Sequence, residues 1–113
     1  MIDTRYKKII TDPTNINKYI HDFGFHDFRI IEIKYNSQTK EASFFIQDTW
    51  DKKKEFELWL FEISGIKHFD YNSGDGDFDI CEIGLEDNTL SASGHLGNNL
   101  LIEAEHFELG IPK

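Results

Sequence analysis

Residues 28–48 read FRIIEIKYNSQTKEASFFIQD, two stretches in which apolar and polar side chains alternate, separated by a short polar break. Alternation with period two is typical of a half-buried β-strand, and the polar NSQTK is typical of a hairpin loop. The stretch therefore predicts two antiparallel strands, at residues 28–35 and 41–48. Each strand places three apolar side chains on one face: Ile31, Ile33 and Tyr35, then Ala42, Phe44 and Ile46.

The same pattern continues through most of the remaining chain. EFELWLFEI, FDICEIGL, LSASGHL and LLIEAEHFEL each alternate, and short polar segments such as EDNT and GNN lie between them. Short turns favour an antiparallel meander, because parallel strands need crossover connections of a dozen or more residues. The further predicted strands cover residues 55–63, 78–85, 89–96 and 100–109.

One helix is predicted, ahead of the first of these strands. Asp12 suits the position that caps a helix, Pro13 suits its first turn, and Gly24 suits its end. Between them an apolar stripe recurs with helical spacing, which predicts a helix over residues 13–23. The fold class expected for residues 1–113 is α+β and mostly β, a single domain in which one N-terminal helix packs on a curled antiparallel meander of about six strands. The stripe consists of Ile16, Tyr19, Ile20 and Phe23.

The expectation that the sheet curls comes from a second set of apolar side chains. An antiparallel sheet with one wet face should be polar on that face. Either the sheet curls and buries both faces, or the second face meets another chain, as in a homodimer through Trp59 and Phe61. We favour curling, because a single short helix cannot cover six strands. The set that falls opposite the assigned core face is Phe45, Trp59, Phe61, Cys81, Ile83, Leu101 and Phe107.

Composition narrows the function classes. The 113 residues carry a formal net charge of −9, which argues against a nucleic-acid partner, since phosphate binding needs clustered Lys and Arg. No run approaches the roughly 18 apolar residues that a membrane span requires, and the first residues, MIDTRYKKII, lack the apolar core of a secretory leader. One cysteine cannot form an internal disulfide. We expect a cytoplasmic protein that binds neither nucleic acid nor membrane.

Acidic residues concentrate between residues 70 and 87, where no Lys or Arg occurs. One interpretation is a solvated surface that keeps the protein soluble. The other is a patch complementary to a basic protein partner, with Tyr71 as an aromatic anchor. The candidate partner-binding residues are Asp70, Tyr71, Asp75, Asp77, Asp79, Glu82, Glu86 and Asp87.

Residues 21–30 read HDFGFHDFRI and contain two His-Asp pairs at the join between the helix and the first strand of the sheet. We interpret His26 and Asp27 as a structural pair, in which the carboxylate fixes the tautomer of the ring and holds the helix to the sheet edge. A zinc site needs three or four ligands that converge from separate elements, and the spacing of the other histidines does not indicate convergence. We therefore assign no metal ligand and no cofactor. The other histidines considered were His68, His95 and His106.

Two further sequence patterns are candidates for a functional site, a calcium-binding loop and a reactive cysteine. Asp75, Asp77 and Asp79 match the first positions of a calcium-binding loop, but the sixth position is Ile80, inside a predicted strand, where such a loop requires glycine. A hairpin turn is the better interpretation. Cys81 lies mid-strand between acidic residues, an environment that keeps a thiol unreactive. We assign no catalytic residue and expect a protein that is not an enzyme.

The segments FGFHDFRIIEIKYN and FELWLFEISGIKHFDYN resemble small uncharacterised bacterial proteins in which a Phe-His-Asp segment opens a β-meander. Several such families resemble the immunity proteins encoded beside polymorphic toxins. The resemblance spans roughly residues 20–110, and its most specific piece is Phe25-His26-Asp27. It implies a cytosolic protein that neutralises a cognate toxin by binding it. It carries no binding residue to this chain.

Three classes of function follow. The first is a non-enzymatic binding protein of the immunity type, whose acidic surface meets a basic toxin domain. The second is a small dimeric structural or assembly module. The third is a metal-dependent enzyme that uses His26 and Asp27, and it is the least favoured.

Overall fold

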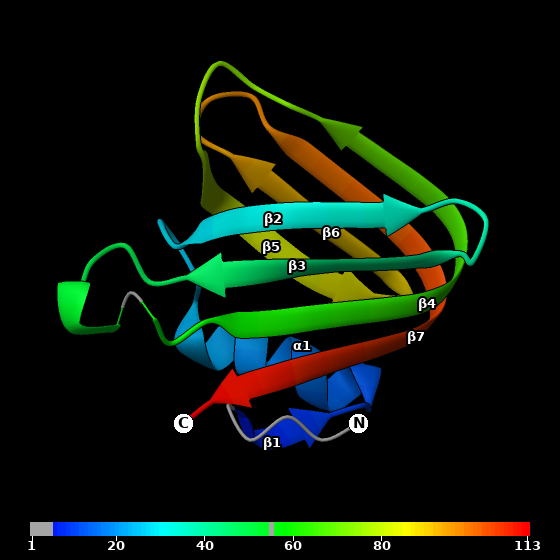
Figure 1. The fold of residues 1–113 in the computed structure, drawn as a ribbon, viewed down its shortest axis with the longest axis horizontal. Helices are drawn as coiled ribbons and strands as arrows, with labels where there is room; N and C mark the ends of the chain where they lie inside the picture. The colour runs from blue at the N-terminus through cyan, green and yellow to red at the C-terminus, as the bar shows by residue number, and fades with distance from the viewer. Residues whose placement is uncertain (1–5, 55) are drawn as a thin grey trace.

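The computed structural model describes residues 6–54 and 56–113 and shows a mostly β protein with one α-helix (Figure 1). In chain order the elements are β1 (Tyr6–Ile10), α1 (Pro13–Phe23), β2 (Arg29–Asn36), β3 (Glu41–Gln47), the 3-10 helix η1 (Lys52–Lys54), β4 (Trp59–Asn72), β5 (Phe78–Glu86), β6 (Thr89–Gly94) and β7 (Asn99–Pro112).

Six of the strands close into an antiparallel barrel. The strand order is β7-β4-β3-β2-β5-β6, and β6 pairs again with β7, which completes the ring. In Figure 1, β2 and β3 lie in front and β5 and β6 lie behind, while β4 and β7 each run between the front and the back. Because β6 pairs with β7, closure leaves neither edge strand of the six-stranded sheet unpaired. The expectation of a curled antiparallel sheet is therefore confirmed. The extra strand, β1, pairs with the last residues of β7, beyond the part of β7 that pairs with β6.

Consecutive strands of the barrel are neighbours everywhere except at one point. β4 pairs with β3 and β7, whereas β5 pairs with β2 and β6. The connection at residues 73–77 therefore joins two strands that do not pair with each other. This arrangement places β5 between β2 and β6, and that placement creates the site described below.

The interior is filled by aromatic and branched aliphatic side chains from both sides of the barrel. Phe44 on β3 and Phe61 on β4 are fully buried and stack with 5.0 Å between ring centroids. Phe25, from the connection after α1, is also fully buried and meets Trp59 edge-on at 5.0 Å. Each buried aromatic removes about 150–250 Å² from water, so these rings contribute much of the core's stability.

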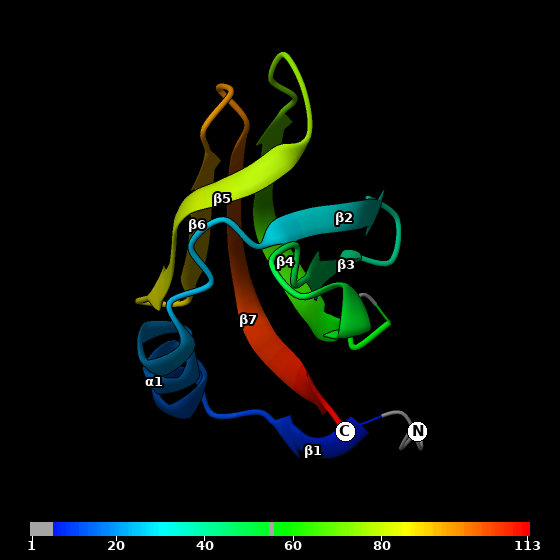
Figure 2. The same ribbon diagram turned by 90° about the vertical axis from the view of Figure 1, so that its left-hand side faces the viewer.

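Helix α1 lies across the lower end of the barrel, close to the ends of β5 and β6 (Figure 2). The Asp12 carboxylate accepts a hydrogen bond from the Thr14 N–H at 3.1 Å, and the helix ends at Gly24, whose φ is 76°. Both ends agree with the bounds expected from the sequence. Ile16 and Ile20 point into the core, and the side-chain oxygen of Asn17 accepts a hydrogen bond from Leu85 N–H at 3.2 Å, which ties α1 to β5.

Several strand bounds differ from the expectations. Strand β4 begins at Trp59 rather than at residue 55, which lies outside the described residues, and it runs on to Asn72 instead of ending at 63. Strand β1 was not predicted. The other five predicted strands differ by no more than three residues at either end: expected 28–35, 41–48, 78–85, 89–96 and 100–109 are observed as β2, β3, β5, β6 and β7 with the bounds given above.

The inward face of β4 is also the opposite of the one expected. Trp59 and Phe61, expected opposite the core face, are 7% and 0% exposed, whereas Phe56, which precedes β4, is 87% exposed. The segment is apolar on both faces, so its pattern fits two phases, and a one-residue shift exchanges them. Because Trp59 and Phe61 lie inside the barrel, they offer no surface to a second copy of the chain.

A β-bulge changes the alternation of β2. Ile30 is buried, and the register with β3 shifts between Ile31 and Lys34, where Glu32 takes a φ of 53°. The three residues expected on one face, Ile31, Ile33 and Tyr35, therefore do not share one environment. Ile33 packs against the core, while the Tyr35 ring is 39% exposed.

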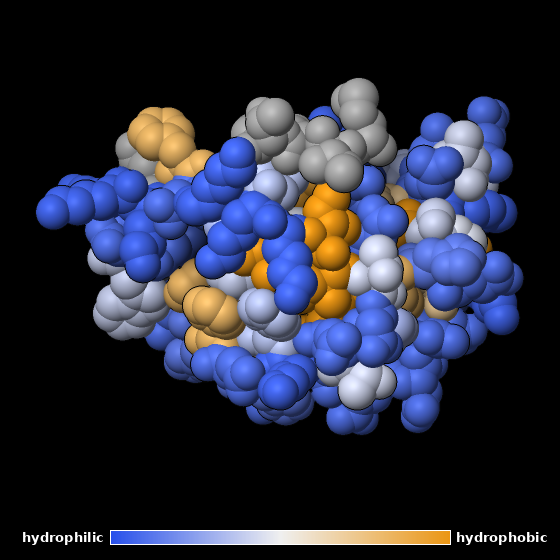
Figure 3. All heavy atoms as spheres, turned by 90° about the horizontal axis from the view of Figure 1, so that it is seen from below, coloured by the Kyte–Doolittle hydropathy of each residue, from blue (hydrophilic) through white to orange (hydrophobic). Residues whose placement is uncertain are grey.

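The underside of the molecule, where α1 and β1 lie, carries an apolar strip between hydrophilic side chains (Figure 3). A shallow groove of about 570 Å³ runs there between β1 and α1, and Ile9 in it is 37% exposed. Within residues 6–54 and 56–113, no helix combines the length and the apolar character needed to cross a membrane.

Candidate functional site

The outer face of β5, β6 and β7 is hollowed into a groove of about 950 Å³, bordered by α1 and by the end of β4. Four carboxylates line it, and none of its lining residues is Lys or Arg. We call this feature the acidic groove. It is defined by the carboxylates Asp70, Glu82, Glu86 and Asp87 and by floor residues Ser91, Ser93 and Leu101.

The groove exists because the middle strand presents small side chains outward. Successive residues of a strand point to opposite faces, so Leu90 and Ala92 of β6 are buried while Ser91 and Ser93 face outward. Two serines between the longer side chains of β5 and β7 leave a trough. Leu101 on β7 adds an apolar contact surface that is 39% exposed.

Three of the seven acidic residues singled out in the sequence lie outside the acidic groove. Asp77 and Asp79 pair with Arg29 at the start of β2: its Nε lies 2.8 Å from Asp79 Oδ1, and its Nη2 lies 3.4 Å from Asp77 Oδ2. The hydrogen bond to Asp79 raises the pKa of Arg29 above its usual value, although partial burial opposes this. One guanidinium thus already offsets part of the negative charge of Asp77 and Asp79.

Asp75 and Tyr71 are also outside the acidic groove. The Asp75 N–H donates to the Leu96 carbonyl at 3.0 Å, which holds the 73–77 loop against the β6–β7 turn. The Tyr71 ring is 39% exposed and stacks on Phe78, with 6.3 Å between centroids. The structure therefore gathers only four of the eight candidate contact residues into one concave surface.

The His26-Asp27 pair forms, but it is partly exposed and has a third member. His26 Nδ1 lies 3.1 Å from Asp27 Oδ2, and the two side chains are 60% and 32% exposed. The other carboxylate oxygen, Oδ1, lies 2.6 Å from Nε2 of His95, in the turn after β6. The Asp27 N–H donates to the Ile80 carbonyl at 2.8 Å, so this loop is held to β5 as well.

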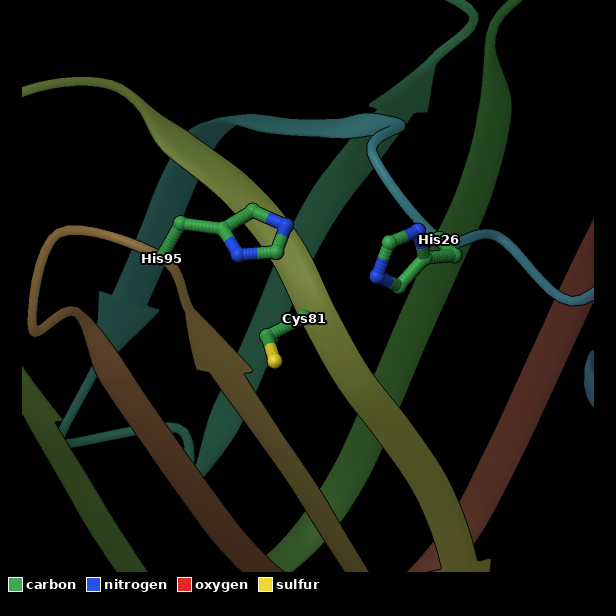
Figure 4. Close-up of side chains that lie close together, drawn as sticks. All are labelled: His26, Cys81 and His95. Carbon is green, nitrogen blue, oxygen red and sulfur yellow. The ribbon is translucent and has the colours of Figure 1, made fainter.

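Cys81 lies beside the two histidines. It is the extra residue of a β-bulge, because Ile80 pairs with Gly94 and Glu82 pairs with Ser93. Bulges redirect side chains, and here the bulged residue is solvent-exposed. The ligand atoms of His26, Cys81 and His95 lie within 4.8 Å of one another, and the three side chains come from three separate segments (Figure 4).

The spacing of His95 from His26 in the sequence does not indicate that the two residues meet. The contact depends on β5 lying between β2 and β6, whereas a simple succession of hairpins would place β5 beside β4. His68 and His106 lie on β4 and β7 and do not join the cluster.

The class of protein is thus a small, closed antiparallel barrel whose lower end is covered by one helix. It carries an acidic groove on one outer face, and a cluster of His26, Cys81 and His95 that shares two residues with that groove. Comparison of the chain with family models, with curated proteins and with solved structures finds no match.

Proposed function

We propose that this protein is a non-enzymatic binding protein that receives a basic segment of a protein partner in the acidic groove. The observation that supports the proposal is a concave surface with four carboxylates and no Lys or Arg in its lining. Clustered charge of one sign in a concave site concentrates its field and attracts the opposite charge. The complementary partner is a surface rich in Lys and Arg.

The dimensions of the acidic groove favour side chains or a short segment over a whole domain face. Its volume, about 950 Å³, is near the upper end of typical small-ligand pockets. Hydroxyl groups of Ser91 and Ser93 can accept hydrogen bonds from guanidinium or ammonium groups, and Leu101 can contact their aliphatic parts. The groove therefore suits projecting Lys and Arg side chains.

The FGFHDFRIIEIKYN segment resembles immunity-type proteins, and this resemblance is consistent with a partner whose surface is rich in Lys and Arg. A nuclease toxin carries a basic surface because it must hold phosphates. An acidic inhibitor that covers this surface excludes the substrate and associates rapidly through electrostatic steering. We infer that the partner is the basic domain of a cognate bacterial toxin and that binding neutralises it.

The decisive experiment combines growth rescue with binding. A toxin-like domain encoded next to this chain is expressed alone and with the chain, and binding is measured by calorimetry at two salt concentrations. The double variant Glu82→Lys/Glu86→Lys should abolish rescue and weaken binding at least tenfold, most strongly at low salt.

The matched control is Glu41→Lys/Glu62→Lys, which makes the same change of charge on exposed residues of β3 and β4, outside the acidic groove. It should retain rescue and binding. Absence of both rescue and a complex at micromolar concentration would refute the proposal. Equal loss in the two double variants would place the contact outside the acidic groove.

A further inference from the structure

The cluster around Asp27 has the donor set and the orientation of a metal site. Its members are two imidazoles and a thiol that approach one another from the α1–β2 connection, from β5 and from the turn after β6. A metal site needs ligands that converge from separate segments. Two residues that are neighbours along one strand do not meet this criterion. Within residues 6–54 and 56–113, this is the only group of at least three His, Cys, Asp or Glu whose ligand atoms come this close.

Asp27 determines which ring nitrogens remain available. Its Oδ2 contacts Nδ1 of His26 at 3.1 Å, and its Oδ1 contacts Nε2 of His95 at 2.6 Å. A neutral imidazole has one N–H, and here each ring directs it to the carboxylate. The lone pairs of His26 Nε2 and His95 Nδ1 are left free to bind an ion.

This arrangement is the one that metal-binding histidines use. Such a histidine almost always donates its second ring N–H to a carboxylate, a carbonyl or water, which fixes the tautomer and strengthens the donor nitrogen. Here one carboxylate serves both rings. Asp27 is therefore a positioning residue and not a ligand.

We propose that His26, Cys81 and His95 form a zinc site in which Asp27 orients both imidazoles. A thiolate with two imidazoles suits zinc, which favours sulfur and nitrogen ligands in a tetrahedron. On binding, the Cys81 thiol releases its proton to solvent. The thiolate and the Asp27 carboxylate then balance the two positive charges of the ion.

The geometry is close to what zinc requires. Ligand atoms of a tetrahedral zinc site lie about 3.3–3.8 Å apart, given bonds of about 2.0–2.3 Å. The atoms here are within 4.8 Å of one another, so closure needs rotations of exposed side chains. Three protein ligands leave the fourth tetrahedral position for water.

The site is tested on the protein alone, without a partner, so its outcome is independent of the proposed binding function. Tag-free chain is stripped with a chelator, and zinc is titrated in competition with a chromophoric chelator. We expect one zinc per chain. Cobalt in place of zinc should give a thiolate-to-cobalt charge-transfer band and the visible bands of a tetrahedral ion.

Variants assign the ligands. Cys81→Ser should remove the charge-transfer band, and Cys81→Ser and His95→Gln should each weaken zinc binding at least 100-fold. His68→Gln and His106→Gln remove histidines outside the cluster and should leave binding unchanged. Melting curves without metal show whether each variant still folds.

Asp27→Asn tests the positioning role. Asparagine tolerates the left-handed backbone at this position, but its amide can accept from only one ring, so the other ring is driven to the wrong tautomer. Zinc binding should weaken about 10–100-fold with the metal-free melting temperature little changed. The inference is overturned if zinc does not bind at one per chain, or if Cys81→Ser and His95→Gln bind it as tightly as the unaltered chain.

Discussion

Asp27 and His95 are 68 positions apart in the chain, yet Oδ1 of Asp27 lies 2.6 Å from Nε2 of His95. The contact ties the α1–β2 connection to the β6–β7 turn across β5. Asp27 holds this position with a φ of 67°, in the left-handed region that residues with a Cβ disfavour. Hydrogen bonds to its backbone, from the Thr49 hydroxyl at 2.6 Å and to Ile80 at 2.8 Å, maintain that conformation.

Substitutions at Asp27 should separate backbone strain from the side-chain contacts. Asp27→Ala and Asp27→Gly both remove the contacts with His26 and His95, but only glycine adopts a φ of 67° without strain. We expect Asp27→Ala to be less stable than Asp27→Gly by about 1 kcal/mol. Urea unfolding of metal-free protein measures the difference. If the alanine variant were as stable as the glycine variant, the loop would not hold this backbone conformation in solution.

The phase of β4 leads to a second prediction. Phe61 is fully buried against Phe44, whereas Phe56 is 87% exposed. Phe61→Ala should reduce the free energy of unfolding by about 3–5 kcal/mol, the usual range for removing a buried phenyl ring. Phe56→Ala, the matched control, should change it by less than about 0.5 kcal/mol. Chemical denaturation checks both, and the reverse ranking would restore the phase expected from the sequence.

Only some features of the fold could be predicted from the sequence. The mostly β class, the curled sheet and the helix at residues 13–23 follow from periodicity and from the caps Asp12 and Gly24, which are local signals. The phase of β4 does not follow, because EFELWLFEI is apolar in both phases and only packing across the barrel chooses between them. The bulge in β2 is likewise invisible, since it depends on pairing with β3.

The candidate sites depend on topology even more strongly. The acidic segment was evident from composition, but its division into a groove and an Arg29-paired loop is set by the pairing of β2 with β5. The same pairing brings His95 to Asp27. A long connection that skips a neighbouring strand leaves no periodic signal, so no spacing rule could have joined these residues.

A glycine in the β4–β5 connection should be required for the loop contact beside this site. A Cβ at Gly74 would lie 2.2 Å from the Leu96 carbonyl oxygen and 2.7 Å from the Asn98 nitrogen, both backbone atoms that cannot turn away. Gly74→Ala should therefore destabilise the chain by about 1–3 kcal/mol. Gly84→Ala is the control, because a Cβ there meets no atom within 4 Å. Thermal melting compares them, and equal melting temperatures would mean that the loop does not pack on the β6–β7 turn.

The ion pairs of Arg29 give a prediction with a defined pH dependence. The hydrogen bond to Asp79 raises the pKa of Arg29 above its ordinary value. A raised pKa of a cationic group contributes stability that is fully present below the unfolded pKa and is lost only as pH rises through the folded pKa. The contribution of Arg29 ionisation should therefore stay constant between about pH 6 and 9, far below both values.

The size of this contribution should be modest, since the side chains of Arg29 and Asp79 are 34% and 33% exposed and water screens their attraction. Arg29→Gln should lower the free energy of unfolding by about 0.5–1 kcal/mol. Lys67→Gln, which removes the same charge from an exposed position on β4, should change it by less. Urea titrations at pH 6, 7.5 and 9 test both claims. A difference between wild type and Arg29→Gln that disappears by pH 9 would contradict the ion pair with Asp79, because a guanidinium keeps its proton throughout that range.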